Sequence, residues 1–367
     1  MKIFMVAGEA SGDVYGGLIA KGFSDSGTTL QGWGGENMTS SGVMVTKHYR
    51  ELAYMGVWEV IANLPAILQN IQSCWDEIQA FNPDALVLID FPGFNMRIAR
   101  KAHKAGIKVY QVVAPQVWAW KKSRVKNLAR DYSAVFPVLP FEHDFLSKFG
   151  VRSIYHGHPI LDTLDPTSTK AEHEIHAQKP ILALLPGSRK QEIQKMLPLL
   201  LNVAKKFPSM TPIVAGAPGT SKELYRLAKK TGINVVFGKT KDVLGAAKLA
   251  VVTSGTATLE AAILQAPHVL VYKTSWLTYL AAKTLVKVKY IGLTNLILGR
   301  EAIPELIQDQ CTAENIQREL SSKKVNAQLE AFQELRGLLG EKGASKKIAD
   351  TILSFISNDQ LIQGPKD

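Results

Sequence analysis

The stretch VAGEASGDVYGG, from Val6 to Gly17, overlaps the end of an apolar run, Ile3 to Ala7, at the start of the chain. An apolar run, a glycine-rich turn and a helix-like segment predict the first strand, loop and helix of a parallel α/β sheet. The glycine spacing fits neither the dinucleotide loop G-x-G-x-x-G nor a P-loop, which ends in G-K-[ST]. Ser11 or Asp13 could cap the following helix, so a capped turn and a ligand loop both stay open at this point.

Length and composition predict a globular protein with more than one domain. The chain has 367 residues, of which 46% are hydrophobic, enough for two domains with sizeable cores. Its two cysteines, Cys74 and Cys311, lie far apart outside any metal-binding spacing, which suits a reducing compartment. Neither a signal peptide nor an uncharged apolar run of about 18 residues is apparent. We therefore expect a cytoplasmic protein, and contact with a membrane surface stays open.

The net charge of +11 is concentrated in one part of the chain. A run of ten basic residues without any acid is most simply a solvated helix face, yet here it favours an anionic partner. Zinc-finger spacing and RNA-binding aromatic signatures are missing, so we expect no nucleic acid; anionic lipid or a phosphorylated substrate is favoured. The basic residues are Arg97, Arg100, Lys101, Lys104, Lys108, Lys121, Lys122, Arg124, Lys126 and Arg130.

Short apolar runs alternate with helix-like segments along the chain, which predicts two doubly wound parallel sheets in tandem. The expected architecture is α/β, with two Rossmann-like domains facing across a cleft and ligands outside the carboxyl ends of the strands. We expect domains at residues 1–165 and 166–325, and C-terminal helices at 326–367 that could pack back onto the first domain. The expected strands are Ile3–Ala7, Ala85–Ile89, Val109–Val113, Ala134–Val138, Ile181–Leu185, Thr211–Ala215, Asn234–Phe237, Leu249–Thr253 and His268–Tyr272.

Two loops of the second half have the chemistry of a nucleoside diphosphate site. Ser188 and Arg189 follow one expected strand, and the arginine fork suits phosphate. After another strand, Ser254, Gly255 and Thr256 open a helix whose free N–H groups could bind a diphosphate, with Glu260 one turn further in to accept from a ribose. Each turn alone is more often a capped structural turn; together they predict a nucleotide site.

In the first half, Asp90 directly follows the expected strand Ala85–Ile89. It is either a general base at the cleft or the cap of the next helix. His156 and His158 would share one face of a strand, but no third ligand is within reach, so we expect no metal. The chain also lacks a D-x-D pair for a metal-bound diphosphate and the G-x-S-x-G elbow of hydrolases.

Several long motifs, in order, resemble the lipid-A-disaccharide synthase family. They are GEASGD (8–13), MGVWEV (55–60), IDFPGFN (89–95), PQVWAWKKSRVK (115–126), LPFE (139–142), GHP (157–159), LLPGSR (184–189), TSGTATLE (253–260) and TNLILGRE (294–301). The resemblance implies an inverting, metal-independent glycosyltransferase without a cofactor. Such an enzyme joins UDP-2,3-diacylglucosamine to 2,3-diacylglucosamine 1-phosphate, giving lipid A disaccharide 1-phosphate and UDP.

The resemblance also implies roles for individual residues. Asp90 matches the base that would deprotonate the 6-hydroxyl of the acceptor. The donor site would contain Ser188, Arg189, Ser254, Gly255, Thr256 and Glu260, with Asn295, Arg300 and Glu301 near the donor. The first loop, with Glu9, Ser11 and Asp13, would lie on the acceptor side, and which of the three touches substrate stays open.

A lipid substrate requires an apolar surface, and one segment has the spacing for it. Its apolar residues recur at helical intervals, which indicates either a core helix or a face that enters the membrane interface. We expect peripheral association with the inner membrane, and a homodimer is possible on this sequence. Other UDP-sugar enzymes of the same fold, a peptidoglycan transferase or an epimerase, are the alternative function. The segment's residues are Trp58, Ile61, Leu64, Ile67, Leu68 and Ile71.

Overall fold

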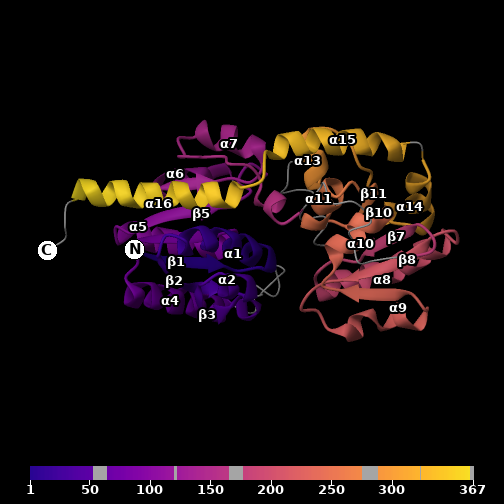
Figure 1. Ribbon diagram of the computed structural model, residues 1–367, viewed down its shortest axis with the longest axis horizontal. Helices are drawn as coiled ribbons and strands as arrows, with labels where there is room; N and C mark the ends of the chain where they lie inside the picture. Colours follow the sequence, from indigo (N-terminus) through magenta and orange to yellow (C-terminus); the bar gives the residue numbers. More distant parts are fainter. Residues whose placement is uncertain (53–63, 120–121, 165–176, 275–287, 323, 364–367) are drawn as a thin grey trace. The chain divides into compact units, whose positions relative to one another are not determined.

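The computed structural model describes residues 1–52, 64–119, 122–164, 177–274, 288–322 and 324–363. Two compact units divide the chain (Figure 1). The first consists of Met1–Asp162 and returns at Gly340–Asp367; the second is Thr163–Leu339. The linker residues 165–176 lie outside the described residues.

The first unit is built on a six-stranded sheet in the order β3-β2-β1-β4-β5-β6, with every neighbouring pair parallel. This order reverses direction between β1 and β4, and such a switch point is where open α/β sheets bind ligands. The strands are β1 (Lys2–Ala7), β2 (Thr29–Gly34), β3 (Met44–His48), β4 (Ala85–Ile89), β5 (Lys108–Val112) and β6 (Ala134–Phe136). The helices are α1 (Ala10–Ser24), α2 (Glu36–Ser40), α4 (Leu64–Phe81), α5 (Pro92–Lys104), α6 (Val125–Asp131), α7 (Pro140–Ser147) and α16 (Ala344–Gln363).

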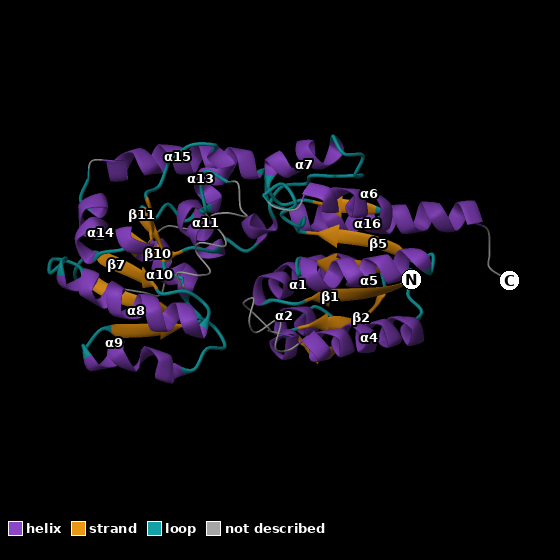
Figure 2. Cartoon of the chain, turned by 180° about the vertical axis from the view of Figure 1, so that it is seen from behind, coloured by secondary structure: helices purple, strands orange, loops and turns teal. Residues whose placement is uncertain are grey.

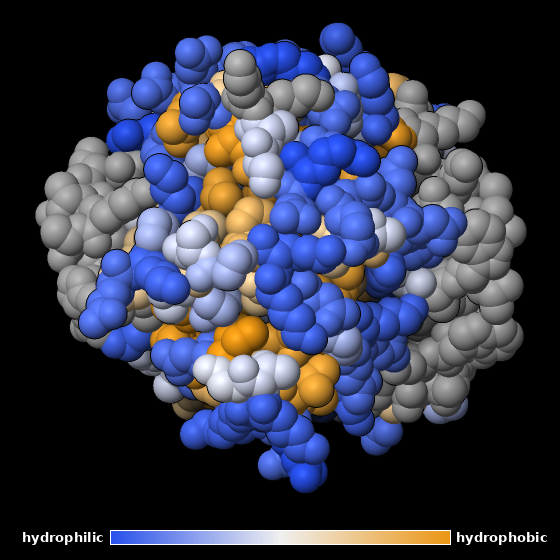
Figure 3. All heavy atoms as spheres, turned by 90° about the vertical axis from the view of Figure 1, so that its right-hand side faces the viewer, coloured by the Kyte–Doolittle hydropathy of each residue, from blue (hydrophilic) through white to orange (hydrophobic). Residues whose placement is uncertain are grey.

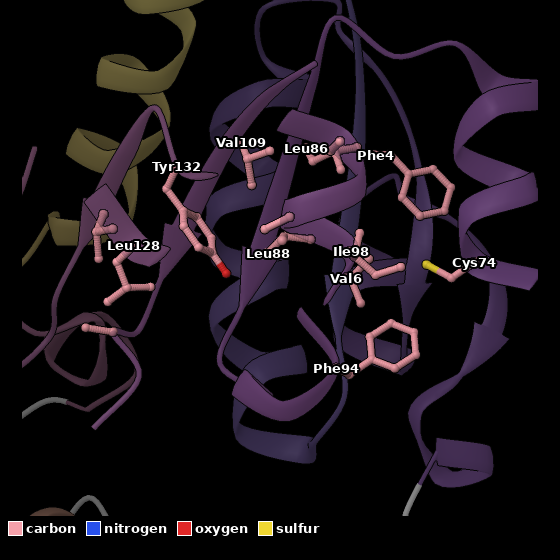
Figure 4. Packing of buried hydrophobic residues seen from close by; sticks show 14 of the residues in the cluster. Phe4, Val6, Cys74, Leu86, Leu88, Phe94, Ile98, Val109, Leu128 and Tyr132 are labelled. Carbon is pink, nitrogen blue, oxygen red and sulfur yellow. The ribbon is translucent and has the colours of Figure 1, made fainter. Parts of the chain in front are cut away.

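One layer of the core of this unit lies between the sheet and helices α4, α5 and α6 (Figure 4). Alternate residues of β1 and β4, such as Val6 and Leu88, pack against Cys74 of α4 and Ile98 of α5. Their neighbours in β1 and β4 are buried on the opposite face, so both strands are apolar throughout. That is the pattern of central strands in a parallel sheet, and it is why these two strands could be predicted from sequence.

Helix α16 brings the end of the chain back to the first unit and packs against α1. The carboxylate of Asp162 accepts hydrogen bonds from the backbone N–H groups of Gly343 and Ser345, which ties the start of α16 to this unit. Further along, the Phe355 ring stacks near Tyr110, with centroids 6.3 Å apart. Helix α15, in contrast, belongs to the second unit, so α15 and α16 are parts of different units.

The second unit repeats the same topology with the order β12-β11-β10-β7-β8-β9, again wholly parallel, and its switch point lies between β7 and β10. Figure 2 shows helices on both faces of each sheet. The strands are β7 (Ile181–Leu185), β8 (Thr211–Gly216), β9 (Asn234–Phe237), β10 (Ala247–Thr253), β11 (His268–Tyr272) and β12 (Glu305–Ile307). The helices are α8 (Lys190–Lys205), α9 (Arg226–Lys230), α10 (Thr240–Ala246), α11 (Thr256–Ile263), α13 (Leu293–Leu298), α14 (Ala313–Leu320) and α15 (Lys324–Leu339).

The expected fold class is confirmed, and three strands are additional to the expectation: β2, β3 and β12. Strand β2 reads TLQGWG, and its glycines hide it from sequence patterns because glycine weakens a strand. Gly32 is required there, since a Cβ would lie 1.9 Å from the carbonyl oxygen of Met5 on β1. The described side chains on the face shown in Figure 3 are mostly hydrophilic, with apolar ones scattered between them, as on ordinary soluble surfaces.

Candidate active site

The loops after β1 and β4 meet at the switch point of the first unit. Gly8 follows β1, and a Cβ placed on it would lie 2.3 Å from the ring of Phe91, which comes just after β4. A Cβ on Gly12 would lie 3.6 Å from the carbonyl oxygen of Ile89. Gly8 therefore allows the first loop to pack closely on the turn that carries Asp90, whereas a Cβ on Gly12 would make only an ordinary contact.

Asp90 is the first residue after β4 and sits in an unusual backbone conformation. Its φ is 49°, as is that of Phe91, so two successive non-glycine residues occupy the left-handed region. Burial raises the pKa of the Asp90 carboxyl above its ordinary value, and a hydrogen bond from the Phe91 backbone opposes this in part. Among the described residues, no cationic side chain forms an ion pair with it. A carboxylate with a raised pKa is a stronger base, which suits proton abstraction.

A second carboxyl, Glu142, lies at the start of α7 in the same unit. It is 2% exposed, and its Oε1 accepts a 2.8 Å hydrogen bond from Nε1 of Trp118. Its Oε2 accepts from the backbone N–H of Leu139 at 3.2 Å. Burial raises the pKa of Glu142 to about 7, and the negative charge of Asp90 adds to this. The Glu142 carboxylate thus caps the start of α7, and the LPFE motif does not signal this role because Leu139 lacks the hydroxyl of a standard capping box.

The acids of the first loop have different positions. Asp13 is 1% exposed, and both of its carboxylate oxygens accept hydrogen bonds from the start of α2: from the N–H groups of Gly35, Asn37 and Met38 at 2.7–3.1 Å. The side-chain amide of Asn37 adds another at 2.8 Å. Asp13 therefore caps the start of α2 and ties it to α1, while Glu9 and Ser11 are half-buried.

At the switch point of the second unit, the loop after β7 carries Ser188 and Arg189, both exposed. Glu192 reaches back to this loop: its carboxylate accepts from the N–H of Ser188 at 3.1 Å and of Arg189 at 3.3 Å. The Arg189 guanidinium lies 3.3 Å from the same carboxylate. Gly187 has φ 106°, and a Cβ there would lie 2.6 Å from the Glu192 carboxylate, so glycine is needed for this turn.

The loop after β10 ends at Gly255, the residue before α11, and the space around this glycine is open. Gly255 has φ 155°, and a Cβ on it would meet nothing within 4 Å. The Ser254 N–H is bonded to the carbonyl of Val271, and the Thr258 N–H to that of Gly255. The N–H groups of Thr256 and Ala257, at the very start of α11, have no acceptor within the helix. Glu260 lies half-buried one turn further on; burial raises its pKa and the charge of Lys241 opposes this.

The segment from Asn295 to Glu301 differs in burial from residue to residue. Asn295 is completely buried. Its Oδ1 accepts hydrogen bonds from the N–H groups of Ala302 and Ile303, and its Nδ2 donates one to the carboxylate of Glu305. Its side chain thus stabilises the fold around α13, which packs on α11. Arg300 is exposed and paired with Glu334 of α15, and Glu301 is exposed as well. Among the described residues, no hydrogen bond or ion pair joins this segment to Ser254 or Glu260.

The apolar segment of α4 divides between core and surface. Ile71 is buried in the core and Ile67 packs partly against it. Leu64 and Leu68 point outward, with 47% and 53% of their surfaces exposed. Trp58 and Ile61 lie outside the described residues. Among the residues that the structure describes, no helix is long and apolar enough to span a membrane, and no cluster of three metal-ligating side chains occurs.

Solved structures that align with this chain have the GT-B fold, with two Rossmann-like domains. UDP-GlcNAc 2-epimerase from Neisseria meningitidis, bound to UDP-GlcNAc, aligns with a TM-score of 0.66 over 96% of this chain and all of that one, at 14% identity. The calicheamicin glycosyltransferase CalG4 aligns with a TM-score of 0.61 at 14% identity, over 97% of this chain and 98% of that one. At this identity the likeness concerns the fold, which is that of the GT-B glycosyltransferases.

The sequence identifies the family within this class. The family model described as lipid-A-disaccharide synthetase matches residues 3–348. Lipid-A-disaccharide synthase of Myxococcus xanthus (strain DK1622) is 35% identical over 373 residues, covering 97% of each chain. That of Syntrophus aciditrophicus (strain SB) is also 35% identical, over 96% of this chain and 97% of that one. The chain belongs to the lipid-A-disaccharide synthase family, and it is a glycosyltransferase of lipid A biosynthesis. Its substrates are a UDP-sugar and a lipid-linked sugar.

Proposed function

We propose that the enzyme transfers 2,3-diacylglucosamine from UDP to the 6-hydroxyl of 2,3-diacylglucosamine 1-phosphate, with inversion and without a metal. The first unit would bind the acceptor and the second the UDP-sugar. The observation that carries this division is that the two kinds of group follow strands at the switch points of different sheets. The proposed general base, Asp90, lies in the first sheet's loops, and the proposed diphosphate-binding groups, Arg189 and the start of α11, lie in those of the second.

Asp90 is the proposed base. As the acceptor oxygen bonds to C1 of the donor sugar, its proton passes to the Asp90 carboxylate. The bond from C1 to the diphosphate oxygen breaks, and the electron pair leaves with UDP. The raised pKa of Asp90 favours this transfer because it brings the base closer to the pH at which the enzyme works.

Departure of UDP requires stabilisation of the growing negative charge on the diphosphate. The first-turn N–H groups of α11 and the dipole of that helix would supply part of it, beside Gly255, where no side chain obstructs the approach. Arg189 would supply a positive charge by exchanging the Glu192 carboxylate for a phosphate. Glu260 would accept hydrogen bonds from the ribose hydroxyls, and Glu9 or Ser11 would contact the acceptor sugar.

The lipid chains imply contact with a membrane, and we place it at the start of α4. Leu64 and Leu68 are exposed there, and α4 packs beside α5, whose Arg97 and Arg100 are also exposed. Apolar side chains flanked by basic ones bind an anionic bilayer surface. The enzyme would therefore work peripherally at the inner face of the cytoplasmic membrane.

The reaction is tested with UDP-2,3-diacylglucosamine and 2,3-diacylglucosamine 1-phosphate, with products identified by mass spectrometry and the anomeric linkage by NMR. The expected product is the β-1′,6-linked disaccharide 1-phosphate, formed at the same rate with and without EDTA. Formation of an epimerised UDP-sugar, an α-linkage or a loss of activity in EDTA would contradict the proposal.

A further inference from the structure

A completely buried glutamine, Gln111, lies in β5 between β4 and β6. A polar side chain inside an all-parallel sheet is costly unless its groups are hydrogen-bonded. The side-chain Nε2 of Gln111 lies 3.3 Å from the carbonyl oxygen of Asp90, 3.1 Å from that of Val112 and 3.0 Å from that of Val113. One amide therefore joins the ends of two neighbouring strands, and one of these ends carries Asp90.

Two of these three carbonyls belong to residues in the left-handed conformation. Asp90 has φ 49° and Val113 has φ 62°. This conformation is unfavourable for L-residues and most unfavourable for β-branched ones such as valine, so surrounding contacts must hold it in place. The Asp90 carbonyl also accepts a 2.8 Å hydrogen bond from the side-chain amide of Asn95 on α5. The Asp90 turn is thus held from the sheet and from the helix.

We propose that Gln111 is a positioning residue for Asp90. Its amide holds the turns at Asp90 and Val113 in their left-handed conformations, and Asn95 holds the Asp90 turn from the other side. An apolar residue of the same size would fill the space in β5 but would release both turns. This inference rests on the proposed role of Asp90 as the base, because its consequence for activity is a misplaced carboxylate.

The first test replaces the amide by an apolar group of similar size, Gln111→Leu. We expect kcat to fall by about 100-fold, the loss typical of a catalytic group displaced by about 1 Å. Affinity for UDP, measured by calorimetry, should change less than about twofold, since the UDP site is placed in the second unit. Gln31→Leu is the matched control, because Gln31 is a half-buried glutamine of β2 in the same sheet; its kcat should be unchanged.

A second substitution separates positioning from general support of the fold. Glycine adopts φ 62° without strain, so Val113→Gly lowers the cost of the turn that Gln111 holds. In the double variant Gln111→Leu/Val113→Gly, we expect kcat to recover about tenfold and the thermal midpoint to rise relative to Gln111→Leu. The inference would be overturned if both kcat and the thermal midpoint failed to recover in the double variant. It would also be overturned if the Gln111→Leu enzyme had a kcat within about twofold of the parent.

If Gln111→Leu does not fold, Asn95→Ala removes the other amide from the Asp90 carbonyl. Its kcat should fall about tenfold with UDP affinity unchanged, and an unchanged kcat would overturn the inference. An Asp90→Asn enzyme with full activity would refute the proposed role of Asp90 as the base. It would not refute the role of Gln111 in holding the two turns, because the thermal midpoint of the Val113→Gly variants tests that role without any turnover.

Discussion

Glu142 makes stability depend on pH in a way that a single substitution can isolate. Burial raises its pKa to about 7 in the folded protein, from an ordinary value of 4.5. Between these values the folded state holds a proton that the unfolded state has released, so the free energy of unfolding falls as pH rises from 4.5 to 7. A difference of 2.5 pKa units corresponds to about 3 kcal/mol at 1.36 kcal/mol per unit. Glu142→Gln, which resembles the protonated form, should abolish this dependence.

The assay is urea unfolding of both proteins between pH 4.5 and 8, followed by tryptophan fluorescence. The difference between the two free energies of unfolding cancels the titration of all other groups. Relative to the parent protein, Glu142→Gln should gain about 3 kcal/mol in free energy of unfolding as the pH rises across this range. Glu341→Gln, at an exposed glutamate of the same unit, is the control and should show a constant difference. A constant difference for Glu142→Gln would refute the reasoning.

Three further outcomes follow from the site and its surroundings. Arg189→Ala and Glu260→Gln should each weaken UDP binding by about tenfold in calorimetry, because each removes a charged hydrogen-bonding group from the proposed donor site; unchanged titrations would contradict that site. Leu64→Ser with Leu68→Ser should lower binding to anionic liposomes by about tenfold without a change in thermal midpoint, since both side chains are exposed. His158 is buried with its pKa lowered to about 3, so the protein should lose about 1 kcal/mol of stability for each pH unit between 6.5 and about 3, and a difference curve against His158→Asn should show this loss.

The liposome experiment has a matched control in the same unit. Met44 of β3 is 60% exposed but lies at the strand end opposite to the start of α4, so Met44→Ser should leave liposome binding unchanged. Global unfolding of the double leucine variant would mean that this part of α4 serves the core, and equal losses for both variants would mean that exposed apolar groups act nonspecifically.

The sequence predicted the architecture well because the central strands of a parallel sheet are apolar on both faces. Strands β1 and β4 are such runs, and the loops that follow them were predicted as the site. The loops after β7 and β10 were predicted as a nucleotide site from their own side chains and glycines, and the structure places both at the switch point of the second sheet.

What the sequence did not predict depends on contacts between residues far apart in the chain. In the sequence Asp13 looks like a loop acid, and only its hydrogen bonds to residues 35–38 reveal that it holds the start of α2. Asn295 belongs to a motif whose buried amide holds residues 302–305. In the sequence, Gln111 is only a polar residue within a short apolar strand. Its hydrogen bond to the Asp90 carbonyl joins β5 to the end of β4, and the sequence alone does not show that contact. Such contacts leave no local periodicity to detect.

The central claim is that Asp90 accepts the proton of the acceptor hydroxyl, and the kcat of Asp90→Asn tests it most directly. Measured with both acylated substrates at saturation, kcat should fall by at least about 100-fold, while UDP affinity and the thermal midpoint stay close to those of the parent enzyme. Asp76→Asn, at an exposed aspartate of α4, serves as the control and should keep full activity. An Asp90→Asn enzyme that retains kcat within a few-fold of the parent would contradict the account.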